Sequence, residues 1–562
     1  MKKYILFILM FIGTMAYSHK NISHRAFLEK NLTEIEKLAA TAKVWGFLKY
    51  YHPKVADGSQ NWDEQLFKIL RQTENTQTVQ QFSNAISDWI MSLGEVKKYE
   101  NIKTDIDNVY FDKNIDFSWF DDRTIFTKEL SQMLKFVQKY KFQGENYYVT
   151  FQKKDPNAVP LQFINEVKYS KFDWTDKNMR LLAFFRYWNY VEYFFPYKYQ
   201  TDQDWNLVLT EMMPKFSDPK TELDFHLAMR ELSVKLNDSH SSLGTSKMYD
   251  KFGEKFVPAD FKIIDSKAVV VGLKNDSLAR ISDIKIGDVI TEVEGKSIQT
   301  IIKENTKYVE GSNKASVLRN FYWAIFNGNS DSVQVKYTRE GRSSQKYIKR
   351  YEYAYLIAIP KPKEKWRFLN NKVSYVNLGE ITEDDVPEMM NKIMVSDAII
   401  FDLRNNARGA DYLIAEYLNP EPREFVKFAD ADLKTPGNFI WRKEEEKCGK
   451  VNPNYYKGKV IVLVNEVTQS HGEYTAMSLK VAPNTTVIGS QTSGADGGVV
   501  RFEIIRGFRT QFSSYGVFYP NKKETQRIGI VPDIKVEQTI KGIQSGKDEI
   551  LERALKFAEK GK

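Results

Sequence analysis

Ser470 lies at a point in the sequence where a serine side chain could act as a nucleophile. An apolar run typical of a buried strand, KVIVLV, ends just before Asn465, and a helical pattern begins at about Ser470. The free N–H groups at the start of a helix, together with the helix dipole, favour the negative charge that develops on a carbonyl oxygen during acyl transfer. The same place is typical of a serine that caps a helix, so the segment alone leaves both roles open.

Three segments, in order along the chain, match motifs of one peptidase family. They are IIFDLRNNARG (399–409), which resembles a DLRxNxGG strand and loop, NEVTQSHGE, which resembles a nucleophile segment, and ETQRIGIVPDI (524–534), which resembles a closing segment. Together they resemble the carboxy-terminal processing, or tail-specific, serine peptidases. The resemblance covers about 253–540 and implies that Ser470 is the nucleophile, with Glu473 as the glutamate three residues later.

The resemblance also implies an oxyanion hole in which a loop glycine N–H is one donor. The family usually has Pro-Gly-Gly in this loop, whereas this sequence has Ala407-Arg408-Gly409. We therefore expect the N–H of Arg408 or Gly409 to be one donor, and the N–H of His471, directly after the nucleophile, to be the other.

A serine nucleophile needs a base, and here the base must come from outside the nucleophile segment. The bacterial members with a Ser–Lys dyad carry a lysine about twenty-five residues after the serine, where this sequence has Ala495. The nearest lysine, Lys480, falls within the helix after Ser470 and should point elsewhere. The departure at Ala495 leaves open a second interpretation, a catalytically decayed protein that binds peptides on the same scaffold.

Of the six histidines, His240 remains as the candidate base. The others flank the expected export cleavage site, fall in helical patterns as packing residues, or follow the nucleophile and should point away: His19, His24, His52, His226 and His471. The stretch LNDSHSSLG resembles the DSH segment of the tricorn-protease branch of the family. This implies that His240 serves Ser470 and that Ser239 is an auxiliary serine.

In the tricorn-like branch a glutamate orients the histidine, so we expect Glu524 or Gln526 to fill that role. The sequence does not decide between them. The alternative for the DSH segment is a helix-end cap by Asp238, with His240 merely exposed.

The N-terminal part, 19–250, is predicted to be a helical domain built from one unit repeated at an offset of 143 residues. The two copies span 33–100 and 176–243; the offset carries Trp45 onto Trp188 and Trp62 onto Trp205. Apolar residues recur at helical spacing in both copies. Thr33 and Glu36 should form a capping box, and Pro53 and Pro196 should end helices.

The rest of the chain predicts a multidomain α/β protein. Short β-runs over 253–350 resemble a PDZ-like module, with a β-rich linker domain as the alternative, and buried strands alternate with helices in an α/β peptidase core over 360–540. An amphipathic helix is expected within 541–562.

The composition bounds the setting in which this chemistry would take place. Residues 1–18 form a typical signal peptide, so we expect an exported protein, periplasmic or extracellular, without a membrane span. One cysteine, Cys448, permits no internal disulfide, and no metal or organic cofactor is implied. The net charge of +9 is spread along the chain, so nucleic acid is not an expected partner. The expected substrate is an unfolded protein or peptide, and the oligomeric state is unknown.

Overall fold

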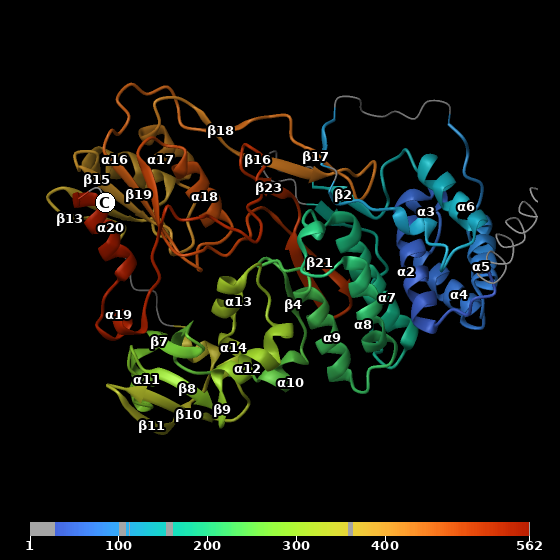
Figure 1. Ribbon diagram of the computed structural model, residues 1–562, viewed down its shortest axis with the longest axis horizontal. Helices are drawn as coiled ribbons and strands as arrows, with labels where there is room; N and C mark the ends of the chain where they lie inside the picture. The colour runs from blue at the N-terminus through green and yellow to red at the C-terminus, as the bar shows by residue number, and fades with distance from the viewer. Residues whose placement is uncertain (1–27, 100–107, 112, 153–160, 358–363, 561–562) are drawn as a thin grey trace, which may run out of the picture.

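The computed structural model describes residues 28–99, 108–111, 113–152, 161–357 and 364–560. A helical region, coloured blue to green, occupies one end of the molecule, and an α/β region that ends at the C-terminus occupies the other; a β-rich module lies beside the latter (Figure 1). The expected signal peptide, residues 1–18, lies outside the described residues. Within those residues, the longest apolar helices fall short of what a bilayer crossing requires.

The helical region is built from two successive sets of helices. Its elements are α2 (Glu34–Tyr51), α3 (Pro53–Ala56), α4 (Trp62–Glu74), α5 (Val79–Ser92), α6 (Lys128–Lys139), α7 (Lys177–Phe194), α8 (Trp205–Ser217), α9 (Glu222–Val234) and α10 (Met248–Phe252), with the turns η1 (Ser118–Asp121) and η2 (Lys198–Gln200) and the paired strands β2 (Val149–Phe151) and β3 (Leu161–Phe163). Thr33 and Glu36 form the expected capping box, and α2 and α7 end just before Pro53 and Pro196.

Each of the two helix sets contains a pair of tryptophans in the same arrangement. The indole N–H of Trp45 donates to the carbonyl of Trp62 at 3.0 Å, and that of Trp62 donates back to Trp45 at 3.1 Å. Trp188 and Trp205 exchange the same two bonds at 2.9 and 3.0 Å. Each indole N–H is thus satisfied in the core, as a buried polar group requires, and the second pair lies at the offset of 143 residues.

The β-rich module consists of an antiparallel sheet with helices packed around it. The strand order is β11-β10-β8-β7-β6, with β9 paired to β8. Its elements are β6 (Ala259–Ile264), β7 (Lys267–Leu273), α11 (Asp276–Ile281), β8 (Val289–Val293), β9 (Lys296–Ser297), α12 (Ile298–Asn305), η3 (Thr306–Tyr308), α13 (Lys314–Asn320), α14 (Tyr322–Phe326), β10 (Ser332–Arg339) and β11 (Arg342–Lys349), with β5 (Lys255–Phe256) paired to β12 (Tyr351–Glu352) and then α15 (Tyr353–Leu356).

The C-terminal region is a three-layer α/β unit. Its sheet has the order β13-β14-β15-β19-β20-β24, and all strands after β13 are parallel. The strands are β13 (Trp366–Asn370), β14 (Val373–Asn377), β15 (Ala398–Asp402), β19 (Lys459–Val464), β20 (Thr485–Gly489) and β24 (Ile534–Lys535). Apolar residues of α16 (Val386–Ile393), α17 (Asp411–Leu418) and α18 (His471–Lys480) form one core with this sheet, and those of α20 (Glu549–Lys560) form another. The turn η4 (Glu383–Asp385) precedes α16, and α19 (Ile540–Gln544) precedes α20.

Two further sheets join the α/β region to the helical region. One contains β1 (Tyr110–Phe111), β16 (Arg423–Ala431), β17 (Phe439–Trp441), β18 (Glu446–Cys448) and β23 (Gly516–Phe518); the other contains β4 (Ser242–Gly244), β21 (Val499–Ile505) and β22 (Phe508–Ser513). Apolar side chains of β21 and β22 belong to the core of the helical region. Because β4 follows α9 and pairs with β22, the 235–241 loop is held against the α/β region.

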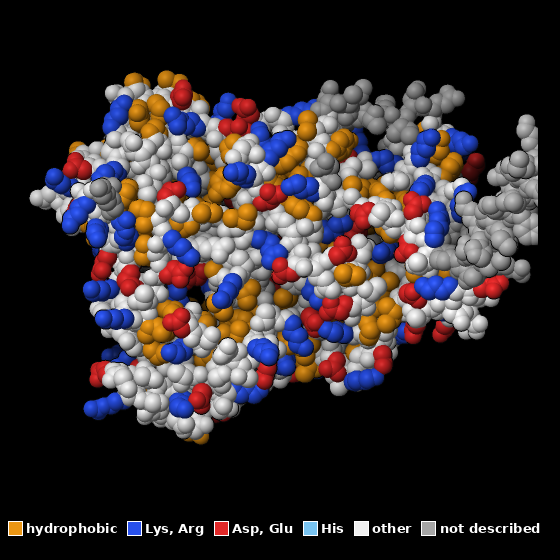
Figure 2. All heavy atoms as spheres, viewed as in Figure 1, with side chains coloured by type: hydrophobic (Ala, Val, Ile, Leu, Met, Phe, Trp, Pro, Cys, Tyr) orange, Lys and Arg blue, Asp and Glu red, His pale blue; other side chains and the backbone are white. Residues whose placement is uncertain are grey.

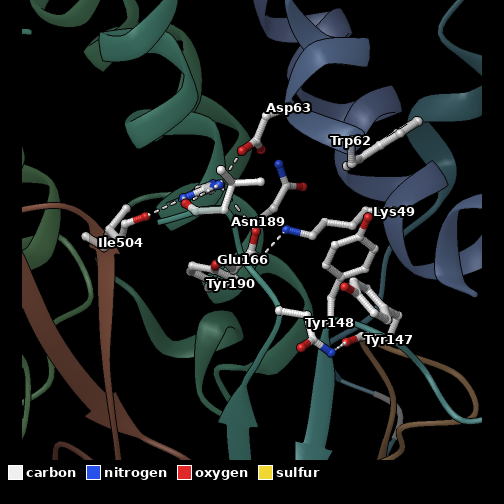
Figure 3. Close-up of polar contacts among 12 residues, drawn as sticks. Lys49, Trp62, Asp63, Tyr147, Tyr148, Glu166, Asn189, Tyr190 and Ile504 are labelled. Atoms are coloured by element: carbon white, nitrogen blue, oxygen red, sulfur yellow. Dashed lines mark hydrogen bonds and ion pairs between the residues drawn. The ribbon is translucent and has the colours of Figure 1, made fainter. Parts of the chain in front are cut away.

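A buried set of charges lies where the two helix sets meet the hairpin β21–β22 (Figure 3). Arg186 on α7 contacts Asp63 on α4 at 2.5 Å, lies 3.5 Å from Glu166, and donates to the carbonyl of Ile504 at 2.9 Å. Lys49 on α2 pairs with Glu166. The side chains of Arg186 and Asp63 are 1% and 4% exposed, so neither charge could be compensated by solvent if its partner were removed.

Arg186→Met is therefore expected to lower the free energy of unfolding by about 3–5 kcal/mol, because it leaves a buried carboxylate without its partner. The measurement is unfolding by urea. The matched control is Arg367→Met, which removes a half-exposed pair with Glu364 and should cost only about 0.2–1 kcal/mol. Equal stability of Arg186→Met and the parent protein would contradict this account of how the regions are joined.

Candidate active site

Ser470 connects β19 to α18 in a backbone conformation that serine rarely adopts. Its φ is 54° and its ψ is −124°, and it occupies the N-cap position of α18. A residue other than glycine held in such a region costs about 1–3 kcal/mol, and strain of this kind is concentrated at functional sites. The Ser470 side chain makes no capping hydrogen bond. The capping role that the sequence left open is therefore not the one the hydroxyl performs.

Glu473 holds the loop that fixes the backbone of Ser470. The N–H of Ser470 donates to the carbonyl of Ala495 at 2.9 Å. The buried carboxylate of Glu473 accepts the N–H groups of Gly494 at 2.8 Å and Ala495 at 3.0 Å, and it binds the hydroxyl of Thr492. The spacing of a serine and a glutamate three residues later thus has a structural reason: the glutamate secures the loop whose carbonyl holds the serine in place.

Two stretches of backbone could supply an oxyanion hole. Within the described chain, the N–H groups of His471, Arg408 and Gly409 donate no hydrogen bond. Gly409 has φ +85°, and a β-carbon placed on it would lie 3.8 Å from Nε2 of His471. The loop therefore lies across from the start of α18. Free N–H groups next to a nucleophile are the donors that a developing oxyanion requires.

Arg408→Pro is expected to lower kcat by about 10²–10³-fold, because proline has no N–H to donate. Arg408→Ala is the matched control; it removes the side chain, which lies 3.4 Å from Glu380, but keeps the N–H. Rates of peptide hydrolysis by the two variants provide the measurement. Full activity of Arg408→Pro would assign the donor to Gly409 instead.

His240 is buried and hydrogen-bonded on one side of its ring. Nδ1 lies 3.0 Å from the hydroxyl oxygen of Ser513. The hydroxyl of Ser513 donates to Oδ1 of Asp238 at 3.2 Å, so it accepts the proton of Nδ1, and Nε2 is left as the acceptor. Within the described chain Nε2 has no hydrogen-bond partner. Burial lowers the pKa of His240, although Asp238 acts in the opposite direction. A neutral ring with a free Nε2 is the state that a general base needs.

The residues that orient His240 differ from those expected. The carboxylate of Glu524 binds Lys113 at 2.8 Å and the hydroxyl of Tyr199 at 3.1 Å, so it is held away from the ring. Gln526 donates from Nε2 to Oδ1 of Asp238 at 3.2 Å, and it therefore contacts the carboxylate and not the imidazole. Tethering of Glu524 by a lysine and a tyrosine from the helical region is the physical reason for the correction.

Asp238 and Ser513 take the place of the expected partner. Oδ1 of Asp238 accepts the N–H of His240 at 3.0 Å, and Oδ2 accepts the N–H of Ser513 at 2.8 Å. Asp238 belongs to the DSH segment that the sequence analysis singled out, but the only role considered for it there was a helix cap. Nothing in the sequence marked Ser513, because its place beside His240 follows from the pairing of β22 with β4.

The segments that carry Ser470 and His240 are bonded through the residues next to them. Gln469, which precedes Ser470, donates from Nε2 to the carbonyl of Ser239 at 3.2 Å. The hydroxyl of Ser239 donates to the carbonyl of Ser493 at 3.0 Å and accepts the N–H of Ser312 at 2.8 Å. The structure thus gives Ser239 a positioning role, in which its hydroxyl ties the histidine loop to the nucleophile loop.

The β-rich module also reaches the nucleophile loop, through Arg319 of α13. Its guanidinium donates to the carbonyl of Glu466 at 2.8 Å, the hydroxyl of Ser493 at 2.7 Å and the amide oxygen of Gln469 at 2.8 Å. Since five donors lie in one rigid plane, an arginine can fix several acceptors at once. The conformation of the loop before Ser470 therefore depends on the module.

Ser470 lines a cavity of about 530 Å³. The cavity walls come from α17, β16, β18 and α18 and from residues just after β17 and just before β21 and β23: Tyr412, Phe428, Arg442, Glu446, Ser470, His471, Tyr474, Asp496, Gly497 and Tyr515. His471 is one of these, so the expectation that its side chain points away from the site is wrong; its Nε2 lies 3.2 Å from Oδ1 of Asp411. Lys480 does point elsewhere, toward the carbonyl of Val531 at 3.3 Å.

Charged side chains of both signs lie on the surface of the protein. On the face shown in Figure 2, basic and acidic side chains are interspersed. The net charge of +9 is therefore not gathered into one patch on this face.

Comparison with known proteins finds similarity over the segment that carries Ser470. Residues 372–536 match the model of peptidase family S41, and no curated protein matches the chain. Among solved structures, mature CPAF complexed with lactacystin covers 67% of this chain and 96% of its own at 15% identity, with a TM-score of 0.51. A CPAF mutant has the same coverage and identity and a TM-score of 0.53. The photosystem II D1 C-terminal processing protease is a weaker likeness, with a TM-score of 0.38 at 16% identity, over 66% of this chain and 98% of its own.

The segment that matches the family model coincides with most of the parallel sheet and with the candidate active site. The matched residues contain the strands β14, β15, β19 and β20, the loop with Arg408 and Gly409, and Ser470 at the start of α18. Residues 372–536, which carry Ser470 and the loop with Arg408 and Gly409, are thus the part of the chain that is similar to peptidase family S41.

Proposed function

We propose that the protein is an exported serine peptidase that hydrolyses peptide bonds in unfolded proteins or in their C-terminal segments. The observation that carries this proposal is the strained Ser470, whose uncapped hydroxyl lines a cavity at the start of a helix. The match of residues 372–536 to the model of peptidase family S41 supports a serine-type reaction. The signal-like residues 1–18 support export to a periplasmic or extracellular location.

In the proposed reaction, the hydroxyl oxygen of Ser470 attacks a substrate carbonyl while Nε2 of His240 takes the proton. The N–H of His471 and that of Arg408 or Gly409 bind the oxyanion. The imidazolium then gives its proton to the leaving amine. In the second half of the reaction His240 takes a proton from water, which attacks the acyl-enzyme, and then returns that proton to the oxygen of Ser470. Asp238 contributes through Ser513: a carboxylate one hydroxyl away favours the charged ring that forms after proton transfer.

The β-rich module fits the proposed role of a PDZ-like peptide binder. Its sheet ends at β6 on one side and β11 on the other, and an extended peptide could add to such an edge. Deleting about 253–350 would not isolate that role, because it also removes Arg319 and Ser312 from the nucleophile and histidine loops.

The test of the proposed function is hydrolysis of unfolded casein and of short fluorogenic peptides by the mature protein. Ser470→Ala is the control for a contaminating peptidase. We expect cleavage by the parent protein and none by the variant. Binding of peptides without cleavage would contradict a peptidase and would support the decayed, peptide-binding interpretation.

A further inference from the structure

Asp496 is a buried carboxylate in the wall of the cavity that Ser470 lines. Its side chain belongs to a residue only 2% exposed. Oδ1 accepts the N–H of Gly497 at 2.8 Å, whereas Oδ2 has no hydrogen-bond partner within the described chain. Burial, reinforced by the negative charge of Glu473, raises the pKa of Asp496 well above its usual value. A buried carboxylate with half of its acceptors unused is costly unless something binds it.

The other charged side chains of the cavity wall already have partners. Arg442 is held by Asp430 through two bonds, at 2.6 and 2.9 Å, so its charge is compensated. Glu446 accepts the hydroxyl of Tyr412. Asp496 is thus the wall carboxylate that has a buried acceptor, Oδ2, without a partner within the described chain.

The rest of the wall is aromatic, and it suits a cation. Tyr412, Phe428, Tyr474 and Tyr515 line the cavity with Asp496. The guanidinium of Arg442 already lies 4.4 Å from the ring centroid of Phe428 and 5.2 Å from that of Tyr515. Aromatic faces attract ammonium and guanidinium groups, and more strongly where water is excluded.

Asp496 lies next to the residue that binds the backbone of Ser470. It follows Ala495, whose carbonyl accepts the N–H of Ser470 at 2.9 Å. A side chain bound by Asp496 would therefore belong to a substrate residue close to the attacked bond. The cavity of about 530 Å³ has room for a long, unbranched side chain.

We propose that Asp496 and the aromatic wall form a subsite for a lysine or arginine side chain on the residue whose carbonyl Ser470 attacks. This inference rests on the proposed function, and it names the substrate class. Aromatic faces hold the stem of the side chain, and its cationic end binds Oδ2 of Asp496. The bound cation favours the ionised carboxylate, which burial otherwise disfavours.

The test uses two diphenyl phosphonate probes that differ only in the side chain next to phosphorus, aminobutyl in one and butyl in the other. We expect the aminobutyl probe to label Ser470 about 10²-fold faster, because its ammonium group pairs with a buried carboxylate. Asp496→Asn keeps the shape and the bond to Gly497, and it should bring the ratio of the two labelling rates close to one. Glu446→Gln is the control, and it should keep the preference.

The outcomes separate this inference from the proposed function. Equal labelling of Ser470 by both probes would overturn the cationic subsite and leave the peptidase proposal standing. Equal loss of both rates in Asp496→Asn, with an unchanged melting temperature, would make Asp496 a general support of the loop and overturn its role in specificity. No labelling of Ser470 by either probe would overturn both.

Discussion

Ser470→Ala is expected to lower kcat by about 10⁶-fold, the loss that accompanies removal of the nucleophile from a serine peptidase. The covalent route disappears with the hydroxyl. The fold should be retained, because the side chain of Ser470 makes no capping bond and the backbone is held through Ala495. Hydrolysis of a fluorogenic peptide under saturating conditions gives the measurement.

Ser470→Gly is the matched variant for the strain at this residue. Both substitutions remove the nucleophile, but glycine adopts a φ of 54° without the penalty that a β-carbon imposes. We therefore expect Ser470→Gly to unfold with a free energy about 1 kcal/mol higher than Ser470→Ala. Measurable turnover by either variant, or an unfolding energy of the glycine variant well below that of the alanine variant, would contradict the nucleophile assignment or the strain.

His240→Ala is expected to lower kcat/KM by about 10²–10⁴-fold, the usual contribution of a positioned general base. His471→Ala is the matched control, since it removes the histidine side chain next to Ser470 in the sequence and keeps the N–H proposed for the oxyanion hole. We expect its loss to be far smaller. A reversed order of losses would make His471, beside Asp411, the base.

The pH dependence of kcat/KM also tests the assignment of His240 as the base. The base acts in its neutral form, so kcat/KM should fall as the pH drops through the pKa of His240. Burial lowers that pKa from its ordinary value of about 6.5, so the acidic limb should lie below pH 6.5 and not in the range 6–7 expected of an exposed histidine. A limb above pH 7 would indicate another base.

The sequence was sufficient for the parts of the site that are local. The strand, loop and helix around Ser470 follow from a buried apolar run and a helical pattern, and the structure has them as β19 and α18. The loop with Arg408 and Gly409 was also recognisable, because its residues are contiguous. Glu473 could be placed by its spacing from Ser470, but its function, securing Gly494 and Ala495, required the fold.

The site residues that the sequence analysis missed or placed wrongly depend on contacts between segments far apart in the chain. Ser513 lies 273 residues from His240, and the two meet because β22 pairs with β4. Glu524 was a reasonable partner by spacing, but Lys113 and Tyr199 bind it first. His471 was expected to point away from the site because it begins a helix, whereas its contact with Asp411 brings it to the cavity. Each case depends on which side chains a distant segment offers.

Mapping the adduct of a fluorophosphonate by mass spectrometry tests the central claim, that His240 activates Ser470, most directly. The parent protein should carry the adduct on Ser470, His471→Ala should be labelled at a similar rate, and His240→Ala should be labelled at least about 10²-fold more slowly. The account would be contradicted by an adduct on another residue, or by His240→Ala reacting at the rate of the parent protein.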